Sequence, residues 1–345
     1  MIRAVPSTAP GEQAGFDRQF FLRLAEDPLV GPATARALDA PALRARRIGL
    51  PVAGRLFALL AGSPQAGLLL AETASLALLI AIAQLGARAG NLSPFAVLAA
   101  PLSLPFALSL ELVTAELGVA ALVLLAAHTH ALLPTIGALT AACLFKEAGV
   151  LAVIAFSLAS FLQGRKREGL LTLTALLPFA GWQLYLSIRL GGGADLPALL
   201  KNLSIPGTGI ARAFSAPLSS LFSGLPDAKA AGLLTATLWY LAGAGLALLL
   251  LRGGLTRGRL LAAAGGALVF ALSYGGSAQA FNEVFNFGRQ LFLLPVGLLI
   301  VLFEETSSLS ARLRASLLTW LAAGALLGLG WFIQEVLSHH PTAWP

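Results

Sequence analysis

The chain has 345 residues, of which 57% are hydrophobic and 11% are charged, with a mean hydropathy of +0.82 and a formal net charge of +7. A soluble globular domain carries about 25% charged residues, so this composition excludes that class. Apolar runs near the length of a bilayer span recur from Leu68 to the C-terminus, more than the core of one soluble domain could bury. Cys143 is the only cysteine, which excludes an intrachain disulfide.

The N-terminal segment, residues 1–65, precedes the long apolar runs and contains two stretches with apolar residues at helical spacing, near 16–26 and 42–60. These stretches predict two amphipathic helices on the membrane surface. Asp17 lies near the start of the first, where the helix dipole stabilises a carboxylate, so periodicity alone favours a capping role over a catalytic one. Arginines of the second stretch suit either a phosphate group or lipid headgroups.

The remainder of the chain predicts about ten transmembrane helices. They cover residues 66–87, 92–109, 112–127, 131–145, 148–163, 169–188, 231–251, 260–278, 290–304 and 315–335. Because the apolar runs are unbroken, helices are favoured over barrel strands, which alternate in polarity. We therefore predict an all-α polytopic membrane protein with one domain, 1–345. It comprises the outer segment 1–65, six helices in 66–188, an external loop at 189–230 and four helices in 231–345.

Alternate loops are short and basic, and the positive-inside rule makes them cytoplasmic. They hold Arg88, then residues 165–167, then Arg252, Arg257 and Arg259, then Arg312 and Arg314. The N-terminal segment carries eight arginines, which argue for the opposite orientation, but the short loops are denser in basic residues. An external N-terminal segment needs something to export it, so we expect that a first transmembrane helix lies upstream of Met1 or has been lost. The Ala/Leu/Arg-rich composition is typical of bacteria, which predicts the inner (plasma) membrane with an outward-facing site.

Glu72 lies inside the first predicted span. A carboxylate at membrane depth is energetically expensive and is a candidate functional group for that reason. If Glu72 instead lies one turn from the outer surface, it needs no special role. The sequence leaves both alternatives open.

Five short segments contain most of the charged motifs of the chain: 16–28 (FDRQFFLRLAEDP), 46–51 (RRIGLP), 110–116 (LELVTAE), 144–151 (LFKEAGVL) and 287–295 (FGRQLFLLP). In this order they resemble elements of bacterial GT-C membrane glycosyltransferases. Residues 16–28 are similar to the signature that follows the first helix of that family. The chain departs from the family at Arg18, where Gly is usual, and at Glu111, where Arg is frequent.

The resemblance implies transfer of a monosaccharide from a polyprenyl-phosphate donor to a lipid, glycan or protein acceptor, with inversion at the sugar. Such a reaction needs a carboxylate that takes the acceptor proton and positive charge that stabilises the departing phosphate. By position in the motifs, Asp17 is the expected base. The expected substrate-binding residues are Gln19, Arg46, Arg47, Glu116, Lys146, Glu147 and Arg289. No cofactor is predicted, a divalent metal is left open, and no nucleic-acid motif is present.

Two other classes of protein are compatible with the sequence. A transporter or flippase of a lipid-linked or small polar substrate would use the same helices, with Glu72 as a proton or ion site. A non-catalytic scaffold would keep the fold without activity. Individual residues also have structural alternatives: Lys146 and Glu147 could form an ion pair at a helix end, and Arg289 could reach lipid headgroups.

Overall fold

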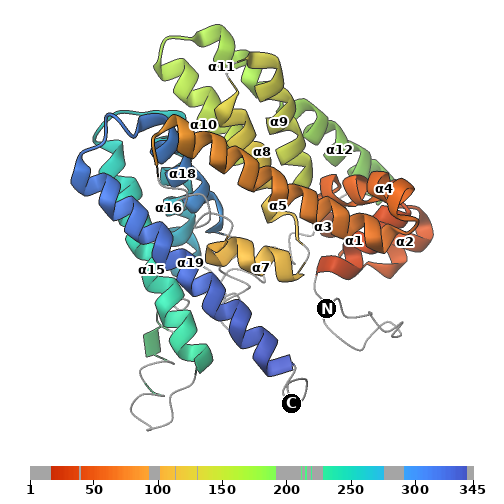
Figure 1. Ribbon diagram of the computed structural model, residues 1–345. Helices are drawn as coiled ribbons and strands as arrows, with labels where there is room; N and C mark the ends of the chain where they lie inside the picture. The colour runs from red at the N-terminus through yellow and green to blue at the C-terminus, as the bar shows by residue number, and fades with distance from the viewer. Residues whose placement is uncertain are drawn as a thin grey trace.

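The computed structural model describes residues 17–38, 40–92, 102–112, 114–129, 131–191, 228–275 and 291–339, with isolated positions between 211 and 219. Within these residues the chain forms helices and turns without strands (Figure 1), which confirms the all-α class. The helices are α1 (Asp17–Glu26), α2 (Pro32–Ala37), α3 (Pro41–Arg44), α4 (Gly49–Ala61), α5 (Pro64–Ala89), α7 (Leu104–Leu112), α8 (Glu116–His128), α9 (Leu132–Phe145), α10 (Gly149–Leu162), α11 (Lys166–Leu173), α12 (Leu176–Arg189), α15 (Ala228–Leu251), α16 (Arg257–Gly275), α18 (Leu293–Glu305) and α19 (Ala311–His339).

Four helical segments among the described residues are long and apolar enough to cross a membrane: Pro64–Ala89, Lys166–Arg189, Ala231–Leu251 and Ala311–Trp331. They support a membrane protein. The prediction of about ten spans is not confirmed, because α8, α9 and α10 have only 13 or 14 residues. Helices of that length extend about 20 Å, against the roughly 30 Å of a hydrocarbon core. Half of the predicted span 92–109, residues 93–101, lies outside the described residues.

The core is centred on α8 and α18, whose residues are buried almost throughout. Helix α18 packs against α5, α8, α15, α16 and α19. Its closest approach is to α16, where small residues meet: a Cβ added to Gly297 would lie 2.3 Å from the backbone nitrogen of Ala262. Small residues let helix backbones approach closely, which is how helices associate where the surroundings are as apolar as the side chains.

The described prolines inside the predicted spans fall in the first turn of a helix. Pro105, Pro134, Pro178 and Pro295 are the second or third residues of α7, α9, α12 and α18. A residue in the first turn has no backbone acceptor within the helix, so the missing N–H of proline costs little there. Pro178 also explains why the predicted span 169–188 is divided into α11 and α12, because it cannot continue a helix that begins in α11.

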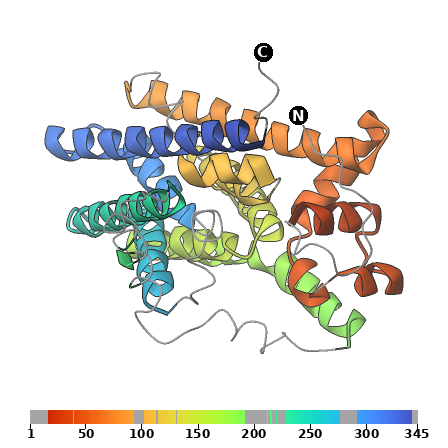
Figure 2. The same cartoon turned by 90° about the horizontal axis from the view of Figure 1, so that it is seen from below.

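The N-terminal helices pack onto the bundle as a folded unit, at the end marked by α4 and α12 (Figure 1, Figure 2). The first predicted amphipathic stretch forms α1. The second forms α3 and α4, separated by a turn. Helix α12 holds this unit in place: Trp182 Nε1 donates to the Ala45 carbonyl at 2.8 Å, and the Tyr185 hydroxyl donates to the Leu29 carbonyl at 2.8 Å. These contacts hold the turns after α1 and α3 against α12.

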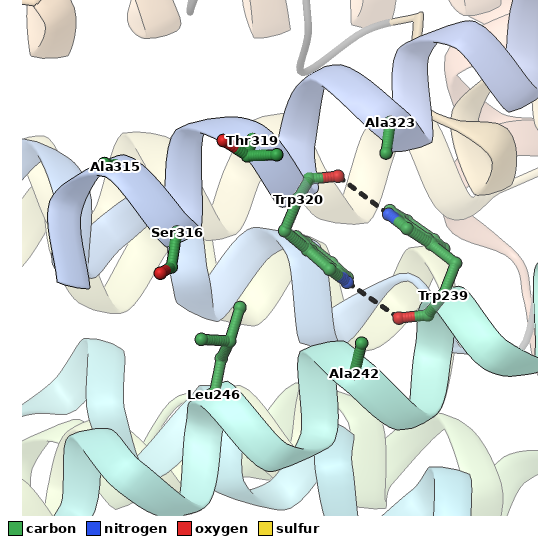
Figure 3. Close-up of a pocket in the computed structure, with 8 residues that line it drawn as sticks. All are labelled: Trp239, Ala242, Leu246, Ala315, Ser316, Thr319, Trp320 and Ala323. Atoms are coloured by element: carbon green, nitrogen blue, oxygen red, sulfur yellow. Dashed lines mark hydrogen bonds between the residues drawn. The ribbon is translucent and has the colours of Figure 1, made fainter. Parts of the chain in front are cut away.

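Helices α15 and α19 are joined by a stacked tryptophan pair (Figure 3). The rings of Trp239 and Trp320 lie 4.2 Å apart at 4°. Each indole N–H donates to the backbone carbonyl of the other tryptophan, at 2.8 and 2.7 Å. Gly243 and Gly324 provide the space, since a Cβ on either would clash with the partner ring. An apolar groove runs along this pair, lined also by Leu246.

The loops predicted to be cytoplasmic meet at one end of the bundle. Arg257 pairs with Glu304 at the end of α18 and donates to the Ala127 carbonyl at the end of α8. Arg259 pairs with Glu305, with Nε 2.7 Å from Oε2. The charged residues predicted to be external are located at the opposite ends of α8 and α9. The described loops predicted to be cytoplasmic and those predicted to be external therefore lie at opposite ends of the helix bundle.

A buried charged cluster as the candidate functional site

Phe145, the last residue of α9, is held between two glycines from distant segments. A Cβ on Gly49 of α4 would lie 2.3 Å from Phe145 Cδ2, and a Cβ on Gly118 of α8 would lie 2.3 Å from Phe145 Cδ1. The next two residues, Lys146 and Glu147, form the turn between α9 and α10. The position of the Phe145 ring therefore decides where these two charged side chains lie.

Each side chain of the turn pairs with a residue two positions before one of those glycines. Lys146 Nζ donates to Glu116 Oε1 at 2.6 Å. The two side chains are only 3% and 1% exposed. Lys146 also lies 5.6 Å from the centre of the Phe292 ring, a cation–π distance. A fully buried pair of this kind stabilises the fold chiefly because neither charge can be left alone.

The second pair, Arg47 with Glu147, is closer to solvent. Arg47 Nε donates to Glu147 Oε2 at 3.1 Å and Nη2 donates to Oε1 at 2.8 Å, a two-pronged contact. The side chains are 13% and 40% exposed. Burial alone would raise the pKa of Glu147, but the charge and hydrogen bonds of Arg47, with a contribution from Lys146, lower that pKa to about 2. Glu147 is therefore ionised at neutral pH.

The structure thus brings together four of the eight predicted site residues, Arg47, Glu116, Lys146 and Glu147, from three of the motif segments. The sequence left open an ion pair between Lys146 and Glu147 as the alternative to a site role, and the structure does not contain that pair. Each of them pairs with a distant residue instead. Arg289 and the side chain of Asp17 lie outside the described residues.

The other predicted residues that the structure describes lie in α1 and in the turn before α4. The backbone of Asp17 begins α1, and Gln19 is half-buried in its first turn. Arg46 is half-buried in the turn before α4 and has no ion pair within the described part of the chain. Arg18 is partly buried, which lowers its pKa, and its Nη2 meets no hydrogen-bond acceptor among the described residues.

Glu72 of α5 is 2% exposed and lies next to this cluster. Its Oε1 lies 3.5 Å from the hydroxyl of Ser109 in α7, whereas its Oε2 has no partner among the described residues. Glu72 is therefore covered by other helices, while its depth relative to the membrane surface stays a prediction. Ser109 itself accepts from the Thr114 hydroxyl at 3.0 Å and from the Leu117 backbone nitrogen at 3.3 Å, which ties Glu72 to the start of α8.

Ser109, Thr114 and Phe145 are site residues that the sequence did not single out. Serine and threonine are frequent in membrane helices, where they bond to their own backbone, so nothing in the pattern marks Ser109. Gly49 and Gly118 gave a weak signal, since each follows a charged motif residue by two positions. The described residues contain no group of three His, Cys, Asp or Glu side chains that could hold a metal ion.

Gly118→Ala should destabilise the protein by about 1–3 kcal/mol, because the added methyl overlaps the Phe145 ring in a packed interior. Unfolding of the purified protein in detergent would measure the loss. Gly137→Ala in α9 is the matched control, since a Cβ there meets nothing within 4 Å. Equal stabilities of the two variants would show that Phe145 is not held between the glycines.

In comparisons with known proteins, no protein-family model, no curated protein and no solved structure matches the chain.

Proposed function

We propose that this protein is a membrane glycosyltransferase that moves a monosaccharide from a polyprenyl-phosphate donor to a lipid, glycan or protein acceptor. The observation that carries the proposal is the convergence of Arg47, Glu116, Lys146 and Glu147. These residues come from separate segments, and each segment resembles a GT-C element. Ion pairing over 30 and 100 residues of sequence separation joins segments that have no local reason to meet.

The two pairs suit different roles. Lys146 and Glu116 are too deeply buried to meet a substrate, so we assign them to positioning the turn. Arg47 is close to solvent, and its guanidinium already presents the planar fork that binds carboxylates and phosphates with two hydrogen bonds. A donor phosphate would then replace Glu147 as its partner. Arg46, half-buried in the same turn, is a second cation for the phosphate.

The proposed chemistry is a single displacement. The acceptor hydroxyl attacks the anomeric carbon while its proton passes to the carboxylate of Asp17. The bond between the anomeric carbon and the phosphate oxygen breaks, and the polyprenyl phosphate leaves with the electron pair. Arg47 and Arg289 would stabilise the negative charge that develops on the phosphate. The outer face of a bacterial inner membrane is the proposed location.

A transporter or flippase is the second candidate, favoured by the buried Glu72. The two classes differ in their dependence on Asp17: an enzyme loses turnover when its base is removed, whereas a transporter or scaffold should keep its function.

The proposal is tested by sugar transfer in liposomes containing the purified protein and polyprenyl-phosphate monosaccharides. Arg47→Lys should raise the KM for the donor about tenfold or more, because lysine cannot replace the two-pronged, charge-assisted contact. Arg165→Lys is the control, since Arg165 forms an exposed pair with Glu168 away from this site. A donor KM that is unchanged in Arg47→Lys would remove Arg47 from the phosphate site.

A further inference from the structure

Glu72 is a deeply buried carboxylate that forms no ion pair with another described residue. Helix α5 packs against α1, α4, α8 and α18. The titratable residues of these helices are Asp17, Arg18, Arg23 and Glu26 on α1, Arg55 on α4, Glu116 and His128 on α8, and Glu304 and Glu305 on α18. No described cation among them lies within ion-pair distance of Glu72.

Most of these groups are engaged elsewhere. Arg55 donates to the carbonyls of Ala25 and Glu26 at the end of α1. Arg23 pairs with Glu26 at the surface, and Glu304 and Glu305 pair with arginines at the opposite end of the bundle. Burial is the main obstacle to a charge on Glu72, and Glu116 adds a smaller repulsion. Because Lys146 is already paired with Glu116, an ionised Glu72 would be a buried anion without a counter-ion of its own, an arrangement that proteins avoid by neutralising the group.

Ser109 provides a means of responding to the charge of Glu72. Its hydroxyl lies 3.1 Å from the Thr114 carbonyl and 3.5 Å from Glu72 Oε1, and its single hydrogen can be donated to only one of them at a time. A neutral Glu72 leaves this hydrogen on Thr114. An ionised Glu72 attracts it more strongly, because hydrogen bonds to charged groups are the stronger ones.

We propose that Glu72 is a reversible proton-binding site whose occupancy is transmitted by Ser109 to the turn between α7 and α8. With the proton bound, the carboxyl is neutral and Ser109 holds the Thr114 carbonyl. When the proton leaves to water, Glu72 becomes a carboxylate, Ser109 turns to Oε1, and the Thr114 carbonyl loses its donor. Because Glu116 begins α8 directly after this turn, the proton on Glu72 is linked to the position of the Lys146–Glu116 pair. This site does not depend on the proposed glycosyl transfer.

Infrared spectroscopy of the purified full-length protein in liposomes tests the proposal directly. At neutral pH the wild type should show the C=O stretching band of a protonated carboxylic acid, and Glu72→Gln should lose it. Glu72→Asp keeps a carboxyl group and should move the band, which preserves the assignment if the amide variant does not fold. Absence of the band in the wild type, or its survival in Glu72→Gln, would overturn the proton site.

Ser109→Ala tests the transmission. Removing the donor to the ionised form should raise the pH at which the band disappears by about one unit or more. The control is Ser157→Ala, a buried serine that bonds to the Gly169 carbonyl on another helix pair and should leave that pH unchanged. An unchanged or lower pH in Ser109→Ala would show that Ser109 does not respond to the charge of Glu72.

Discussion

Asp17→Asn is expected to abolish sugar transfer, with a fall in rate of roughly 10²–10⁴-fold, the contribution that general acid–base catalysis makes. Asparagine keeps the size of the side chain but cannot take a proton. Asp17→Glu, which keeps the carboxylate but displaces it, should leave a trace of activity. Single-turnover transfer from a polyprenyl-phosphate sugar, with folding checked on the same samples, measures both.

Asp27→Asn is the matched control for Asp17, ten residues further along the same motif. The Asp27 carboxylate accepts from the Gly31 backbone nitrogen at 2.6 Å and from the Thr34 hydroxyl at 2.7 Å, which fixes the start of α2. Hydrogen bonds from Thr34 and Gly31 lower the pKa of Asp27, so its amide variant should lose stability and keep turnover in the folded fraction. Transfer that is unchanged in Asp17→Asn would end the assignment of Asp17 as the base and favour a transporter or scaffold.

Lys146→Met has the largest expected effect on stability, about 3–5 kcal/mol. Methionine fills much of the space of lysine, but it leaves the Glu116 carboxylate buried without its cation. The double variant Lys146→Met, Glu116→Gln should recover part of the loss, because the glutamine carries no charge to be neutralised. Denaturant unfolding in detergent, followed by tryptophan fluorescence, gives the difference between the variants.

Arg165→Met is the control that measures the stability cost of breaking an exposed ion pair. Arg165 and Glu168 are 51% and 44% exposed, so breaking their pair should cost no more than about 1 kcal/mol. If Lys146→Met were as mild as Arg165→Met, or if the double variant recovered nothing, the Lys146–Glu116 pair would not be the contact that holds the turn after α9.

The sequence by itself determined the class of protein and most of its helices. Apolar runs and their charged gaps depend only on local composition, because a membrane helix satisfies its own backbone and needs no partner to do so. For the same reason the helical segments were found without knowledge of their packing, and Asp17 was placed at the start of α1. Short motifs also selected Arg47, Glu116, Lys146 and Glu147, because charged residues are rare enough in this chain to be informative.

Only the tertiary structure decided how these residues are paired and how deep they lie. The partner of Lys146 is 30 residues away and that of Glu147 is 100 residues away, and the choice follows from Phe145 lying between Gly49 and Gly118. The apolar pattern placed the C-terminal ends of α8, α9 and α10 to within one residue, but these helices have only 13 or 14 residues and are short for a bilayer span, so about ten spans were predicted where four are supported. Burial of Glu72 depends on the helices that cover α5, and a local pattern holds no information about its neighbours in space.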